Sequence, residues 1–171
     1  MRIEFVEISN FRKLRAVRID LTEDKTLFVG ANNSGKTSAM VALRHFLVDG
    51  GKLGINDFTL SHWHAINAIG SKWEGTGNAN AGGKPDLAEW EGLLPSLDLW
   101  LRVADDEIHY VSKLLPTLDW KGGLLGIRLR FEPKKIEDLY KEYVTSTNDV
   151  RSTKAAAATH IGQEPPIKLW P

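Results

Sequence analysis

The eight residues from Gly30 to Thr37 (Gly-Ala-Asn-Asn-Ser-Gly-Lys-Thr) constrain this chain more than any other segment. They match the pattern G-x-x-x-x-G-K-[ST] at every fixed position. Glycines at both ends let the backbone curl tightly, so that successive N–H groups point inward at an anion. A helix that starts directly after the second glycine adds the partial positive charge of its N-terminus. The motif therefore predicts a phosphate-binding loop between a strand and a helix.

The residues on either side of the motif supply this context. Thr26 to Val29 form a short apolar run, which predicts a strand that ends at Gly30. From Lys36 to Val48 the apolar residues recur at helical spacing and cover most of the surface, which predicts a helix buried against a sheet. A chance match in a glycine-containing turn is the alternative, and the presence of both flanks disfavours it.

A loop of this type binds ATP and Mg²⁺ as its cofactors. Lys36 is expected to reach the β- and γ-phosphates, and the Thr37 hydroxyl is expected to be the metal ligand that joins the Mg²⁺ shell. The position of Asn32 or Asn33 suits a bond to the γ-phosphate or to the attacking water. The predicted cofactor-binding residues of the loop and first helical turn are Gly30, Asn32, Asn33, Ser34, Gly35, Lys36, Thr37 and Ser38.

Alternating apolar residues predict the rest of an α/β fold. Further strands are expected over residues 3–8, 17–21, 97–103 and 127–131, with a hairpin turn at 104–107 and a return strand over 108–115. A helix with one apolar face is expected after Pro133. Residues 70–85 are interpreted as a flexible insertion. The predicted domain covers residues 1–144, and residues 145–171 are interpreted as a linker or the start of a further segment.

Composition excludes several classes of protein. Lys plus Arg equals Asp plus Glu, 22 of each, which disfavours a globally basic nucleic-acid binder. The chain has no cysteine, which removes disulfides, Cys-based zinc sites and a cysteine nucleophile. No apolar run approaches the roughly 20 residues of a membrane helix, and no export signal is visible, so we expect no membrane partner and a cytoplasmic location.

The wider N-terminal region resembles a known family. The segments that carry this resemblance are Ile8-Ser9-Asn10-Phe11-Arg12-Lys13-Leu14, Leu27 to Met40, Ala42 to Leu47 and Ile55-Asn56-Asp57-Phe58. Residues 1–60 resemble the N-terminus of ABC-type ATPases of the SMC and RecF kind, and look most like the OLD family of ATP-dependent nucleases. The resemblance implies a P-loop NTPase of ABC-ATPase type, with a mixed sheet whose antiparallel strands surround a buried P-loop helix.

The same resemblance implies a function for the parent protein. It would be an ATP hydrolase and DNA endonuclease that dimerises through its ATPase heads and acts in DNA processing or anti-phage defence. Arg12 and Lys13 would flank the phosphates or adenine of the nucleotide, although a cluster of basic residues is equally typical of a solvated strand edge. DNA would be bound through domains absent here. The alternatives are a DNA-repair ATPase head of the SMC or RecF type without a nuclease, and a non-catalytic nucleotide-binding interaction module.

Parts that such an ATPase needs are missing from the sequence. The stretch from Leu99 to Glu107 is a poor match for a catalytic strand that ends in Asp-Glu, because Arg102 would place a cation inside a buried strand. Neither a Leu-Ser-Gly-Gly-type signature nor an acidic TOPRIM segment is present, and Gln163 is a doubtful Q-loop residue. No catalytic residue is therefore assigned, and the chain is interpreted as the N-terminal portion of a longer ATPase.

Other candidate sites have simpler interpretations. His62 and His64 would share one face of a strand, but two histidines without a third ligand make a weak metal site. Asp57 is interpreted either as a group near a metal or as a loop-start or capping residue. The six tryptophans favour packing, Arg128 and Arg130 a solvated strand face, and Asp105 and Asp106 a turn.

Overall fold

A computed structural model describes the backbone of residues 1–50, 53–75, 86–115, 117 and 119–161. The chain divides into two compact units. The first unit contains Met1–Leu60 and Leu94–Phe131, and the second contains Ser61–Leu93 and Glu132–Pro171. The predicted boundary at residue 144 stays a prediction.

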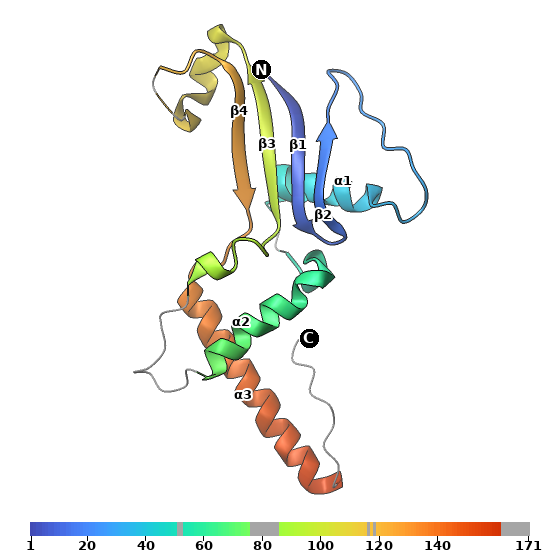
Figure 1. The fold of residues 1–171 in the computed structure, drawn as a ribbon, viewed down its shortest axis with the longest axis vertical. Coiled ribbons are helices and arrows are strands. Elements are labelled where there is room, and N and C mark those ends of the chain that lie inside the picture. Colours follow the sequence, from blue (N-terminus) through green and yellow to red (C-terminus); the bar gives the residue numbers. More distant parts are fainter. Residues whose placement is uncertain (51–52, 76–85, 116, 118, 162–171) are drawn as a thin grey trace. The chain divides into compact units, whose positions relative to one another are not determined.

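A four-stranded sheet forms the frame of the first unit (Figure 1). Its strands are β1 (Arg2–Phe11), β2 (Leu14–Asp20), β3 (Ser96–Val103) and β4 (Gly123–Arg130), in the order β2-β1-β3-β4. All three neighbouring pairs are antiparallel, so the described sheet is not the mixed sheet expected from the sequence. Strands were predicted at these four places, and they are confirmed with earlier starts, although residues 21 and 131 lie outside β2 and β4.

One face of this sheet packs against helix α1 (Lys36–Arg44), which continues as the π-helix η1 (His45–Asp49). The core joins apolar residues of β1, β2 and β3 to two alanines of α1. Its buried members are Val6, Ile8, Phe11, Leu14, Ile19, Ala39, Ala42 and Leu97. The helix is buried on this face only, since Met40 is 59% exposed. The prediction of a helix that packs against a sheet at this position is confirmed, and the buried P-loop helix implied by the resemblance stays a prediction.

The opposite face of the sheet carries aromatic and charged side chains. The rings of Phe5 and Trp100 stack with their centroids 5.4 Å apart, and the guanidinium of Arg18 lies 3.6 Å from the Phe5 ring centroid. Trp100 Nε1 donates to Glu7 Oε2 across 3.1 Å. Arg128 donates to both carboxylate oxygens of Asp98. This face is polar, as predicted for Arg128.

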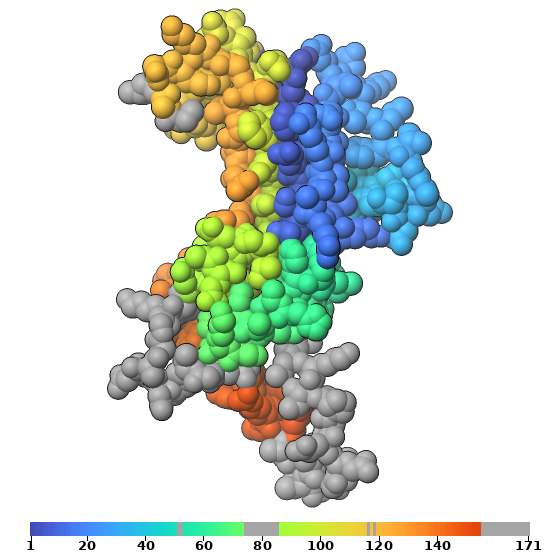
Figure 2. Space-filling model, in the orientation of Figure 1, coloured from blue at the N-terminus to red at the C-terminus, as the bar shows by residue number. Residues whose placement is uncertain are grey.

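Residues 26–29 do not form the strand expected before the phosphate loop. Leu27 is 83% exposed and Val29 is 88% exposed, while Phe28 packs at the margin of the core. The physical reason is that no described strand pairs with this segment, and a strand needs a partner for its backbone hydrogen bonds. Figure 2 shows residues 21–35 on the surface of the first unit.

The expected hairpin after β3 is also wrong. Residues 105–114 form the 3₁₀ helix η5 (Asp105–Leu114), and the antiparallel neighbours of β3 are β1 and β4. Glu107 stabilises the start of η5, because its side chain accepts a bond from the Ala104 N–H across 3.2 Å. The amino group of Met1 also donates to Glu107, and this bond is the main cause of the lowered pKa of that carboxyl.

The second unit is built from helices α2 (Trp63–Gly75) and α3 (Ile136–Ile161), with the short 3₁₀ helix η4 (Leu87–Glu89). The ring of Trp73 lies 5.5 Å from Tyr140 and 5.8 Å from Tyr143, both with edge-on geometry. Residues 70–75 belong to α2 and residues 145–161 continue α3, so the structure shows helix rather than loop at these positions. The assignment of residues 145–171 as a linker or the start of a further segment stays a prediction. Residues 76–85 and 162–171, including Gln163 and Trp170, lie outside the described residues.

Candidate functional site

The loop from Gly30 to Gly35 leads directly into α1, as the motif predicts. Asn33 and Gly35 both have left-handed backbones, with φ angles of 67° and 99°. Glycine suits position 35 for a second reason: an added Cβ would lie 3.0 Å from Leu14 Cδ2. The loop therefore curls tightly and rests directly on the start of β2.

The ammonium group of Lys36 lies inside this curl. Its Nζ donates to the carbonyl oxygens of Gly30 and Ala31, both at 2.7 Å, and to Ser34 Oγ at 3.3 Å. The side chain thus folds back over the loop that precedes it. A positive group held at this point can form charge-assisted hydrogen bonds to phosphate oxygens.

The N-terminus of α1 opens onto the same loop. No side chain of the described residues caps this helix, and its first backbone bond runs from the Ala39 N–H to the Gly35 oxygen. The N–H groups of the first helical turn therefore lack helical partners and are available to an anion. Thr37 is exposed at this end, whereas the Ser38 side chain is buried. This geometry fits a phosphate group at the loop, with the Thr37 hydroxyl available to a metal ion.

The structure separates the two basic residues that were predicted to flank the nucleotide. Lys13 lies against the phosphate loop, where its Nζ donates to the Asn33 carbonyl oxygen at 3.0 Å and also contacts Asn33 Oδ1. Arg12 instead donates from Nε to Asp57 Oδ1 at 2.9 Å. Asn32 is exposed in the loop. Lys13 and Asn33 are thus brought together by direct contact, and Arg12 is held by another segment.

Asp57 lies in the 3₁₀ helix η2 (Ile55–Asp57), and its side chain accepts a bond from the Gly54 N–H at 2.9 Å. The interpretation of Asp57 as a capping residue is therefore confirmed. Its ion pair with Arg12 was not expected, because 45 residues separate the two in the sequence. A buried carboxylate is almost always paired, but the surrounding sequence, which mixes polar and apolar residues, does not show that Asp57 is buried.

Acidic residues do not gather near the loop in the part of the chain that the structure describes. No group of three or more His, Asp or Glu side chains that could hold a metal ion occurs among these residues. Asp105 and Asp106 start η5, after a strand whose neighbours are antiparallel. His62 ends the 3₁₀ helix η3 (Leu60–His62) and His64 lies in α2, so they do not share a strand face.

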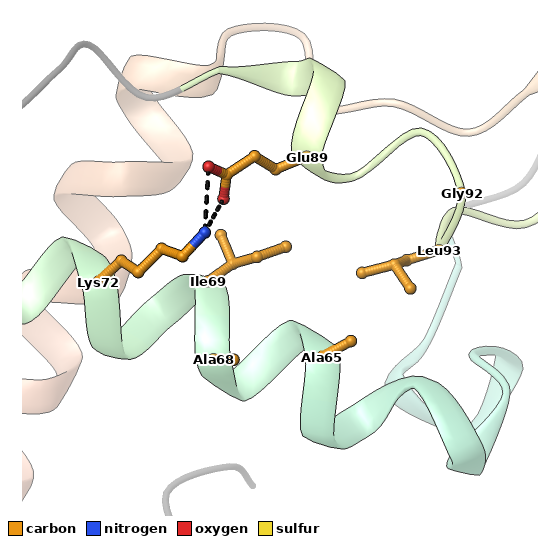
Figure 3. A pocket seen from close by; sticks show the side chains of 7 residues that line it. All are labelled: Ala65, Ala68, Ile69, Lys72, Glu89, Gly92 and Leu93. Atoms are coloured by element: carbon orange, nitrogen blue, oxygen red, sulfur yellow. Dashed lines mark hydrogen bonds and ion pairs between the residues drawn. The ribbon is translucent and has the colours of Figure 1, made fainter.

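A shallow groove in the second unit has a different character (Figure 3). It has a volume of about 460 Å³, and α2 and residues 89–93 line it mainly with apolar side chains. Its charged groups are Lys72 and Glu89, which pair with each other at 3.2 Å. Because this ion pair is internally satisfied, the groove shows no converging polar groups of the kind that orient a substrate.

The glycine-rich loop, the lysine folded inside it and the uncapped helix that follows define a P-loop nucleotide-binding protein. A comparison with family models agrees with this class. The model described as AAA ATPase domain matches residues 1–160, and the chain belongs to that family. Membership supports ATP as the ligand and a nucleotide-binding ATPase function. A comparison with curated proteins gives no match. None of the described helices is long and apolar enough to cross a membrane.

Proposed function

We propose that this chain binds Mg²⁺-ATP at the phosphate loop and forms one part of an ATPase site. The placement of Lys36 Nζ over the loop carries this proposal, since it bonds two loop carbonyls at 2.7 Å beside the uncapped start of α1. On binding, the phosphates would take over the lysine hydrogen bonds. Backbone N–H groups from Ser34 to Ser38 would surround the same oxygens, with Asn32 or Asn33 near the γ-phosphate.

Mg²⁺ would neutralise charge on the β- and γ-phosphates and would be held by the phosphates and the Thr37 hydroxyl. A hydroxyl is only one ligand, and Mg²⁺ in such sites also requires carboxylates or waters. Among the described residues, no group of three or more His, Asp or Glu side chains is placed to hold a metal ion. Hydrolysis is therefore proposed to depend on acidic residues supplied by another segment or subunit.

We further propose that the parent protein is an OLD-like ATPase from the cytoplasm. Its heads would dimerise, and ATP would control a nuclease domain that processes DNA. The exposed apolar side chains of Leu27 and Val29, directly before the loop, support completion of this site by a further strand. A repair ATPase head of the SMC or RecF type is the alternative. A TOPRIM segment in the parent would favour the first, and a long coiled coil would favour the second.

Calorimetric titration of Mg²⁺-ATP into the chain tests the proposed site. Lys36→Ala removes a charge-assisted phosphate contact worth about 1.5–3 kcal/mol, so the affinity is expected to fall roughly tenfold or more. Lys113→Ala, at an exposed position of η5, is the matched control and is expected to bind like the original chain. Equal affinity of the Lys36→Ala variant, or absence of saturable binding by the unmodified chain, would contradict the proposal.

A further inference from the structure

The turn between β1 and β2, residues 10–14, has an unusual backbone. Asn10 and Arg12 both adopt left-handed conformations, with φ angles of 59° and 53°. Asparagine tolerates this region, but arginine visits it rarely, because its Cβ approaches the backbone. Such a conformation persists only where the surrounding structure holds it. The position of this turn is therefore set by its tertiary contacts.

Asp57 supplies these contacts with both its backbone and its side chain. The Arg12 N–H donates to the Asp57 carbonyl oxygen at 2.7 Å, and Arg12 Nε donates to Asp57 Oδ1 at 2.9 Å. The second carboxylate oxygen accepts the Gly54 N–H, so both oxygens are used. Asp57 is only 6% exposed, and an isolated bridge pairs the neighbouring residues Phe11 and Phe58. Arg12 is thus fixed on two sides by one buried residue.

The next two residues of the turn contact the phosphate loop. Lys13 Nζ donates to the Asn33 carbonyl oxygen at 3.0 Å. Leu14 lies directly beneath Gly35, where an added Cβ would approach Leu14 Cδ2 to 3.0 Å. Asn33 and Gly35 are also the loop residues with left-handed backbones. A displacement of the turn would therefore alter the contacts of Asn33 and Gly35, the two positions that shape the loop.

We propose that Asp57 is a positioning residue that fixes the geometry of the phosphate loop through the turn at residues 10–14. Asp57 holds Arg12, and the adjoining Lys13 and Leu14 hold Asn33 and Gly35. Asp57 would act through these residues and not by contact with the nucleotide. The expected consequence for ATP affinity rests on the proposed function, whereas the effect on loop geometry does not.

The test is a double-mutant cycle of Asp57→Asn and Lys13→Met. The amide keeps the shape of Asp57 but replaces one acceptor oxygen with a donor, so it loses its bond to either Arg12 or Gly54. Without nucleotide, backbone order parameters of residues 32–35 are expected to fall toward the value of about 0.6 typical of flexible chains. ATP affinity is expected to fall about fivefold in each single variant, without a further fall in the double variant.

Two controls separate positioning from general damage. Asp98→Asn makes the same chemical change in an exposed ion pair, to Arg128, on the opposite face of the sheet and is expected to leave loop order and ATP affinity unchanged. If Asp57→Asn unfolds the chain, Arg12→Gln, which keeps the backbone bond, takes its place and must give the same loosening of the loop. Two results would overturn the inference. One is a folded Asp57→Asn or Arg12→Gln variant whose loop keeps the order parameters of the original chain. The other is a double variant whose loss of ATP affinity equals the product of the two single losses. If the unmodified chain fails to bind ATP, the proposed function fails, and the order parameters still decide the role of Asp57.

Discussion

Strand β1 and the segment Thr26–Val29 are both rich in apolar residues, yet only β1 forms a strand. β1 lies between β2 and β3, and Val6 and Ile8 are fully buried. Residues 26–29 pair with no strand among the described residues, and Val29 is 88% exposed. The difference shows that an apolar run encodes a tendency to be buried. The neighbours that the fold provides decide whether the run becomes a strand.

The same comparison separates two parts of the candidate site. The base of the phosphate loop rests on packed structure through Leu14 and the turn that Asp57 holds. The segment that enters the loop is exposed. We therefore expect the loop to be shaped from the β1–β2 side, and its entry to be stabilised only when a further strand covers it.

The largest predicted effect comes from one substitution made in both segments. Val6→Ala removes two methyl groups from a position that is 0% exposed, and should cost about 2–3 kcal/mol of unfolding free energy. Val29→Ala makes the same chemical change at an 88% exposed position and should stay within about 0.5 kcal/mol. Urea denaturation of both variants is the measurement. Equal losses of unfolding free energy would contradict the difference between the two segments, because Val29 would then be packed in solution.

A smaller change in stability is expected at two glycines of the second unit, one in a packed position and one in an open position. An alanine Cβ at Gly70 would lie 2.4 Å from the Tyr143 hydroxyl oxygen, whereas at Gly92 nothing lies within 4 Å. Gly70→Ala should therefore cost about 1 kcal/mol, since the clash outweighs the better helix propensity of alanine. Gly92→Ala should be close to neutral. Thermal melting compares them, and a stabilised Gly70→Ala variant would show that Tyr143 moves away freely.

The smallest change in stability is expected for an ion pair on the surface of β1. Arg102 donates to both oxygens of Glu4, and this hydrogen bonding is the main cause that lowers the pKa of Glu4 below its ordinary value of 4.5. A carboxyl with a lowered folded pKa adds stability above its unfolded pKa and loses it as the pH falls through the folded value. Glu4→Gln should therefore lower the melting temperature slightly at pH 7, and the two proteins should converge in acid. A difference that grows in acid would contradict this assignment.

Most elements of the fold could be predicted from local patterns. The strands β1, β2, β3 and β4, and the helix that starts at Lys36, follow from the spacing of apolar residues. The failures lie where a pattern was ambiguous. Residues 108–115 alternate weakly, and all but Leu115 lie in the 3₁₀ helix η5, which begins with acidic residues. Residues 145–161 are polar and alanine-rich but continue α3. Alanine has the highest helix propensity, so a helix was available there without an amphipathic signal.

The features of the candidate site also fall into two groups, those that local patterns predict and those that they do not. The positions of Lys36, Gly35 and Thr37 follow from the motif, because a phosphate loop needs those residues in that order. The partners of Arg12 and Lys13 could not be predicted. Their contacts to Asp57 and Asn33 span 45 and 20 residues, and no local pattern records which distant group a basic side chain meets.

Local sequence patterns predict the phosphate loop, the helix that follows it and most of the strands, because each depends on residue types at short and fixed spacing. Three outcomes depend instead on tertiary contacts: every described strand pairing is antiparallel, residues 26–29 stay exposed apart from Phe28, and Asp57 binds Arg12 in the turn next to the loop. Those outcomes depend on which segments become neighbours. Neighbours are chosen by the packing of the whole chain, which local spacing does not encode.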